Sequence, residues 1–130
     1  NKKRVLSVGQ CSVDHRAICH LMTSRFAAEV VSVDDWQEAQ SRLSDERFNL
    51  ILVNRKLDRD YSDGIDVIRP LKAHTDHAAL PVMLVTNYPE HQEQAVAAGA
   101  EAGFGKLEYD KPETLEKLAR FLEGDSPPTS

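Results

Sequence analysis

Polar residues follow three short apolar runs of the sequence, and a lysine closes a weaker fourth segment. These residues carry the side chains that could do chemistry: Gly9-Gln10-Cys11-Ser12, Asn54-Arg55-Lys56-Leu57, Thr86-Asn87 and Lys106. Amide, hydroxyl and basic groups form hydrogen bonds and attract anions, but none of these positions holds a carboxylate. The sequence offers no pairing of a nucleophile with a base and no cluster of metal ligands, so it does not favour an enzyme.

An alternation of apolar runs with segments of helical period must position these residues. We expect strands over residues 5–8, 30–33, 50–53, 82–86 and 103–106, the last only because the pattern requires it. We expect helices over residues 14–26, 35–43, 65–72, 89–98 and 110–122. Ser12 or Asp14 can cap the first helix, and Pro70 is expected to shorten or kink the third.

Strand–helix alternation of this length predicts one α/β domain over residues 1–123. Its sheet would be parallel and doubly wound, with right-handed crossovers and helices on both faces. Function in such folds lies at the carboxyl ends of the strands, which is where the polar residues fall. Residues 124–130 read as a flexible tail or the start of a linker.

Composition sets further limits on the class of protein. The chain has 130 residues and a formal charge of −5, and its basic residues form no extended cluster, so direct binding to nucleic acid is not expected. No apolar run is long enough to cross a membrane. Cys11 and Cys19 would be too far apart on one helix for a disulfide, and two free thiols suit a cytoplasmic protein.

Five segments in order resemble the receiver domain of two-component response regulators. They are Val33 to Ala39, Phe48 to Asn54, Asp63 to Asp66, Leu80 to Thr86 and Ala98 to Lys106. The resemblance covers nearly the whole chain and implies the flavodoxin-like (βα)5 fold, with five parallel strands. In that family an aspartate at the end of the third strand accepts a phosphoryl group, and two acidic residues after the first strand help to hold magnesium. A hydroxyl and a lysine then contact the phosphate.

Only half of the family's site is present in this sequence. Asn54 stands at the phosphoacceptor position, and Gly9 and Gln10 stand at the acidic pair. Thr86 and Lys106 match the hydroxyl and the lysine. Because an amide is neutral and weakly nucleophilic, an acyl phosphate is not expected to form, and magnesium binding is expected to be lost because this ion prefers anionic oxygens.

Without the acidic groups, the sequence leaves two alternatives open for the surroundings of Lys106. In the first, Lys106 would lie near neutral groups with Arg55 and Lys56 close by and Asn87 as further lining, giving a metal-free, mildly cation-rich cleft able to hold an anion. In the alternative, Lys106 would hydrogen-bond Asn54 and nearby carbonyls, and the site would be inert.

The resemblance therefore points to a pseudo-receiver that works by protein–protein interaction. The expected partner is a signalling protein, the chain's own output domain or a second copy, bound through the fourth helix, fifth strand and fifth helix, with contacts over residues 89–98, Phe104 and residues 110–122. Two alternatives remain: a phosphoreceiver that uses a nonstandard acceptor such as Asp58, and a sensor of small anions or ligands on the same fold.

Overall fold

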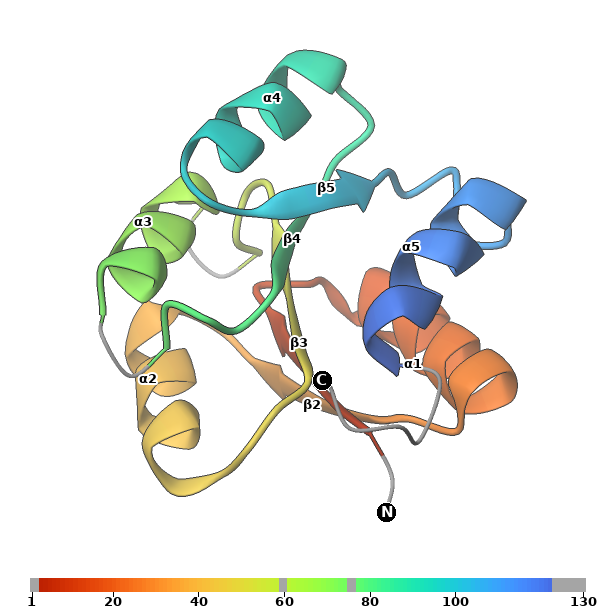
Figure 1. Cartoon of the computed structure of the whole chain (residues 1–130), viewed down its shortest axis with the longest axis horizontal. Helices are drawn as coiled ribbons and strands as arrows, with labels where there is room; N and C mark the ends of the chain where they lie inside the picture. The colour runs from red at the N-terminus through yellow and green to blue at the C-terminus, as the bar shows by residue number, and fades with distance from the viewer. Residues whose placement is uncertain (1–2, 59–60, 75–76, 123–130) are drawn as a thin grey trace.

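A five-stranded parallel sheet forms the centre of the molecule (Figure 1). In the computed structural model, which describes residues 3–58, 61–74 and 77–122, the strands are β1 (Arg4–Val8), β2 (Glu29–Val33), β3 (Leu50–Asn54), β4 (Val82–Val85) and β5 (Glu101–Phe104). Their order is β2-β1-β3-β4-β5, and every pair is parallel. This order is that of the flavodoxin-like doubly wound fold, which confirms the predicted fold class.

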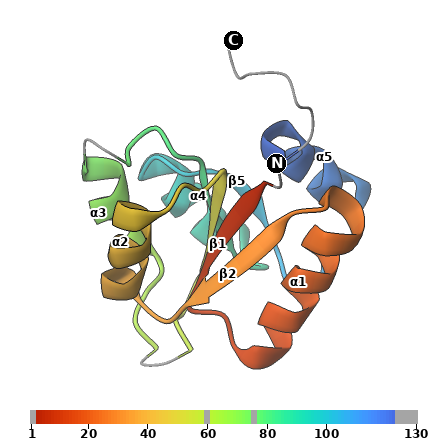
Figure 2. The ribbon, with the colours of Figure 1, turned by 90° about the horizontal axis from the view of Figure 1, so that it is seen from below.

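Helices cover both faces of the sheet, as Figures 1 and 2 show. The helices are α1 (Ser12–Phe26), α2 (Trp36–Asp45), α3 (Ile65–Ala73), α4 (Pro89–Ala97) and α5 (Pro112–Leu122). One apolar core joins α2, α3 and α4 to the sheet, and a second joins α1 and α5 to its other face. All residues of β3 are buried, because this central strand is covered on both sides.

Several boundaries differ from the prediction for local reasons. The fifth strand covers Glu101–Phe104 and not residues 103–106, because the Gly105 N–H donates to the Glu108 side chain and so leaves the strand ladder. A Cβ at Gly103 would meet the carbonyl of Leu84, which explains a glycine within this strand. The last helix begins at Pro112, a residue suited to a first helical turn, and not at residue 110.

The predicted cap of the first helix and the predicted shortening of the third are wrong, whereas a kink at Pro70 stays a prediction. The cap of α1 is neither Ser12 nor Asp14 but Cys11, whose Sγ accepts the Asp14 N–H at 3.5 Å. Pro70 does not shorten α3, which continues to Ala73. Pro70 costs the helix one N–H and crowds the preceding turn, but the apolar residues of α3 remain packed against the sheet.

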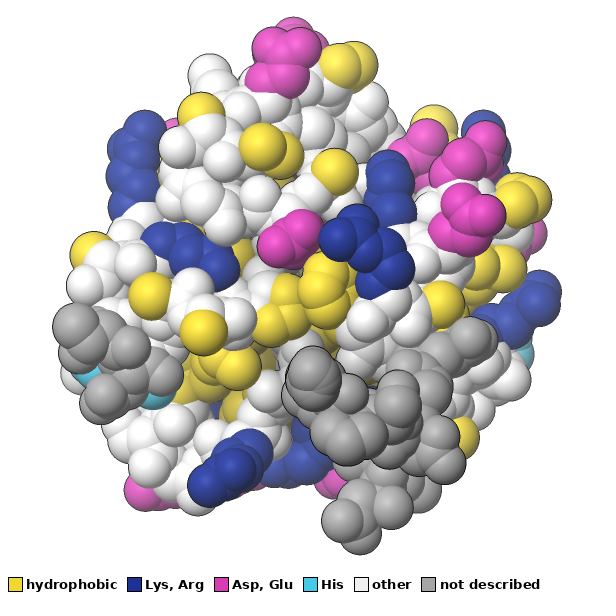
Figure 3. Space-filling model, in the orientation of Figure 1, with side chains coloured by type: hydrophobic (Ala, Val, Ile, Leu, Met, Phe, Trp, Pro, Cys, Tyr) yellow, Lys and Arg dark blue, Asp and Glu magenta, His cyan; other side chains and the backbone are white. Residues whose placement is uncertain are grey.

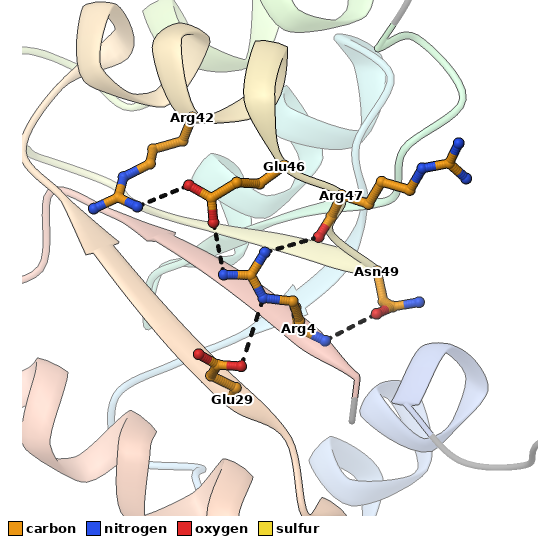
Figure 4. Close-up of polar contacts among 6 residues, drawn as sticks. All are labelled: Arg4, Glu29, Arg42, Glu46, Arg47 and Asn49. Atoms are coloured by element: carbon orange, nitrogen blue, oxygen red, sulfur yellow. Dashed lines mark hydrogen bonds and ion pairs between the residues drawn. The ribbon is translucent and has the colours of Figure 1, made fainter. Parts of the chain in front are cut away.

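Arg4 ties the amino-terminal edge of the sheet together (Figure 4). Its guanidinium lies 2.7 Å from a carboxylate oxygen of Glu46 and 3.6 Å from one of Glu29. Glu46 also accepts a hydrogen bond from Arg42 at 2.8 Å. The hydrogen bonds from Arg42 and Arg4 lower the pKa of the Glu46 carboxyl, so the end of α2 is held to β1 by a charged carboxylate.

No helix among the described residues is long and apolar enough to cross a membrane. The predicted tail, residues 124–130, lies outside the described residues.

Candidate functional site

Three of the four sequence-predicted segments meet at the carboxyl edge of the sheet, whereas residues 9–12 do not line the hollow found there. A hollow of about 190 Å³ opens there, at the ends of β3 and β4. Its lining residues are Asn54, Arg55, Lys56, Val85, Thr86, Asn87, Tyr88 and Lys106. The parallel register of the sheet places the end of β3 beside the end of β4, since Asn54 pairs with Val85. The topology thus brings together residues that are far apart in the sequence.

Asn54 is fixed at the floor of this site by a specific hydrogen bond. The residue is only 6% exposed, and its Nδ2 donates to the carbonyl of Gly9 at 3.1 Å. Gly64 packs so closely that a Cβ there would meet the Asn54 carbonyl oxygen. The amide at position 54 therefore presents a donor to the end of β1, which a carboxylate could not do.

The two residues after β1 provide no charge to the site. Gly9 has a φ of +74° and lies against Leu57, so a side chain at this position would be strained and would collide with that leucine. Gln10 is 7% exposed, and neither polar atom of its amide has a hydrogen-bond partner among the described residues. We find no further structural reason for the glutamine.

Thr86 and Asn87 are both engaged with the backbone. The buried Thr86 hydroxyl accepts the Tyr88 N–H at 3.3 Å, which helps the chain turn into α4. Asn87 Oδ1 accepts the Leu107 N–H at 3.2 Å and so joins the β4–α4 loop to the β5–α5 loop. Both side chains shape the rim of the hollow.

Lys106 does not lie among neutral groups, and this part of the prediction is wrong. Its Nζ lies 2.7 Å from Asp14 Oδ2, on the first turn of α1. The same carboxylate accepts from Cys11 Sγ at 3.3 Å and from the Tyr109 hydroxyl at 3.5 Å. Burial, followed by the nearby Asp14 carboxylate, raises the pKa of Tyr109.

Asp14 is the functional candidate that sequence reasoning missed. It was assigned only as a possible helix cap, although it lies on the first turn of the helix that leaves the carboxyl end of β1. That position was the available signal, because a first-turn side chain at this edge of the sheet can reach the site. Asp14 is thus the carboxylate that pairs with Lys106. The alternative in which Lys106 bonds Asn54 is also not what the structure contains.

The remaining cations of the hollow are Arg55 and Lys56. Neither forms an ion pair with any residue of the described chain. The Arg55 guanidinium carbon lies 5.8 Å from the centre of the Tyr88 ring. A cation–aromatic contact orients the guanidinium without neutralising its charge.

The lining of the hollow contains no carboxylate. Within the described part of the chain, no three His, Cys, Asp or Glu side chains gather as potential ligands. Asp14, the carboxylate bonded to the site's lysine, is already shared with that ammonium group. Magnesium prefers anionic oxygens as ligands, and the loss of magnesium binding stays a prediction.

Five other residues with titratable side chains lie outside this hollow. Asp58 is exposed and does not line it, although its backbone N–H donates to Gly9 O at 2.9 Å. Cys11 and Cys19 are free thiols, as expected. The rings of His74 and His77 stack on each other at 4.4 Å.

Comparisons with known proteins give structural neighbours only. No protein-family profile matches the chain, and no curated protein matches its sequence. A putative response regulator from Chloroflexus aurantiacus superposes with a TM-score of 0.82 at 15% identity, over 94% of this chain and 98% of the other. The chemotaxis protein CheY4 of Vibrio cholerae gives 0.72 at 20% identity, over 94% and 99%.

A third neighbour was solved with magnesium in its active-site cleft. It is the receiver domain of the sensor histidine kinase PA1611 from Pseudomonas aeruginosa, with a TM-score of 0.69, 22% identity and coverage of 94% and 95%. Similarity at these identities establishes that the chain has the receiver fold.

Proposed function

We propose that this chain is a receiver-like module of a two-component or phosphorelay pathway that is not phosphorylated and acts by binding other proteins. The hydrogen bond from Asn54 to Gly9 is the observation that carries this proposal. It places a neutral donor where the receiver resemblance puts the reactive carboxylate. An amide oxygen is a poor nucleophile, so a phosphoryl group has no acceptor at this position.

The surroundings of Asn54 support the same conclusion. The carboxylate nearest to the site's lysine is Asp14, and its charge is neutralised by that lysine. Gly9 and Gln10 offer no anionic oxygen for a metal ion. We therefore propose that magnesium is not a cofactor and that the chain is not an enzyme.

The proposed partner surface is formed by α4, β5 and α5. Phe104, which the sequence analysis placed among the contacts, is 1% exposed and packs edge-on against Tyr109, so it belongs to the core and not to this surface. Val96 on α4 is 47% exposed, and Tyr88 at the start of α4 is 54% exposed. In Figure 3 the hydrophobic side chains over α4 are scattered among polar and charged ones, which suits a reversible contact.

The partner in this proposal is a signalling protein, the chain's own output domain or a second copy of the chain. We propose a cytoplasmic location and no direct contact with nucleic acid or membrane, in keeping with the formal charge of −5.

Intact-mass measurement after incubation with acetyl phosphate and magnesium tests the proposal. The protein should keep its unmodified mass, while a phosphorylatable receiver treated in parallel gains a phosphoryl group. A phosphoryl adduct on this chain that persists in Asp58→Asn would show that another carboxylate serves as acceptor. An adduct lost in that variant would identify Asp58. Either adduct would contradict the proposal.

A further inference from the structure

Arg55 and Lys56 lie between two adjoining hollows at the carboxyl edge of the sheet. The first is the hollow of about 190 Å³ described above, and the second measures about 220 Å³. The second is lined by Arg55, Lys56, Asp63, Ile65, Leu84, His91 and Gln94. Both cations belong to both linings, so the two hollows share these side chains.

Neither of these two cations is paired with an acid of the described residues. Arg55 and Lys56 form no ion pair there, and the lining of the first hollow has no acidic residue. The third cation of that lining, Lys106, is neutralised by Asp14. Asp63 is the single acid in the second lining. A chain with a formal charge of −5 therefore has, in its described part, two adjacent cations without an ion pair at one concave place.

Neutral donors surround the same place. The Thr86 hydroxyl accepts from the Tyr88 N–H, which leaves its own proton free to be donated within the first hollow. The amino-terminal end of α4 begins at Pro89, directly after Tyr88, and no side chain caps it. A helix amino terminus carries partial positive charge, which adds to that of the cations.

We propose that Arg55, Lys56 and Thr86 form a non-covalent binding site for the phosphate group of a small molecule. The guanidinium can contact two phosphate oxygens side by side, and the ammonium acts as a point charge. The site holds the phosphate by hydrogen bonds and charge, and no covalent bond forms or breaks. Each hollow is smaller than the roughly 300–1,000 Å³ of sites for drug-sized ligands, so the phosphate group and little more is enclosed.

The Tyr88 ring lies next to the two cations and indicates which further chemical group of the ligand the site could bind. Arg55 lies over this ring at 5.8 Å, and His91 meets it edge-on at 5.4 Å. Because Tyr88 is 54% exposed, part of its ring remains open to solvent next to the cations. A planar base, joined to the phosphate through a sugar, could pack on the open part of the Tyr88 ring. A nucleoside monophosphate should therefore bind more tightly than inorganic phosphate.

A titration with inorganic phosphate, followed by backbone amide NMR at constant ionic strength, tests this site. We expect saturable shifts centred on residues 54–56 and 86–91. The double variant Arg55→Gln/Lys56→Gln should bind at least tenfold more weakly, while the control Lys111→Gln, which changes an exposed lysine elsewhere, should bind normally. Shifts that do not saturate, or equal affinity in the double variant, would overturn the inference.

The same titration with adenosine monophosphate tests the role of the aromatic ring. Tighter binding than phosphate, lost in Tyr88→Ala, is the expected result, and binding that ignores this substitution would refute the part assigned to Tyr88. Inorganic phosphate cannot donate a phosphoryl group, so these results are independent of whether the chain can be phosphorylated.

Discussion

Replacing Asn54 with aspartate should destabilise the protein and should not create a phosphoacceptor. The substitution removes the hydrogen bond that Nδ2 donates to Gly9 and places a carboxylate oxygen opposite that carbonyl. The lost bond costs about 1 kcal/mol, and a buried, unsatisfied acceptor costs about 1–3 kcal/mol. We therefore expect Asn54→Asp to lower the free energy of unfolding at pH 7 by roughly 2–4 kcal/mol, a large part of the roughly 5–15 kcal/mol typical of a domain.

The penalty should depend on pH in a defined direction. Burial should raise the pKa of a carboxyl at position 54 above the ~3.9 of an unfolded aspartate. Below the pKa of the unfolded aspartate, the carboxyl is protonated in both the folded and the unfolded state, so its charge costs no stability. As pH rises the unfolded state ionises first, so the difference from wild type should grow until the folded-state pKa is passed.

Urea unfolding of both proteins at pH 7 and near pH 3.5 measures this difference. Asn87→Asp is the matched control, because it makes the same chemical change at an exposed residue and keeps the acceptor for Leu107. Its effect should stay within about 0.5 kcal/mol. The double variant Asp14→Asn/Asn54→Asp should recover part of the loss, because Lys106 lines the same hollow and would be free to pair with the new carboxylate. Wild-type stability of Asn54→Asp at pH 7 would refute this reasoning.

Three further predictions concern the contacts around the sheet. Lys106→Met should lower the free energy of unfolding by about 1–3 kcal/mol, because it leaves the mostly buried Asp14 carboxylate without its cation, and chemical denaturation measures this. Hydrogen bonds from Arg42 and Arg4 lower the pKa of Glu46 in the folded state. Its stabilising contribution is therefore fully present above the pKa of the unfolded glutamate and is lost as the pH falls through the folded-state pKa. In urea unfolding at a series of pH values, Glu46→Gln should flatten this part of the dependence of stability on pH. Gly64→Ala should cost roughly 1–3 kcal/mol, since the new methyl group meets the Asn54 carbonyl, and an unchanged thermal midpoint would argue against that contact.

The fold was accessible from the sequence because its signals are local and repeated. Leu50 to Val53 is apolar at successive positions, and burial on both faces of the sheet requires that pattern. The fifth strand was displaced by two residues because its chemistry is not that of a typical strand. Glycine occurs within it for the close approach of Leu84, a tertiary contact that propensity cannot reveal.

The site was predictable in location but not in its ion pairing. The ends of β3 and β4 could be placed together from topology alone, and Asn54 and Thr86 do line one hollow. The partner of Lys106 depends on how the first turn of α1 faces the β5–α5 loop, and sequence spacing says nothing about that angle. Asp14 was therefore missed, and the cleft appeared more basic than it is.

A magnesium titration by isothermal calorimetry, at ion concentrations up to the millimolar range, is the most direct test of a site without the family's acidic groups. We predict no saturable heat of magnesium binding for the wild-type protein. Saturable binding that disappears in Asp14→Asn would show that the Asp14 carboxylate binds a metal ion in place of Lys106. This result would contradict the proposed loss of the phosphorylation chemistry.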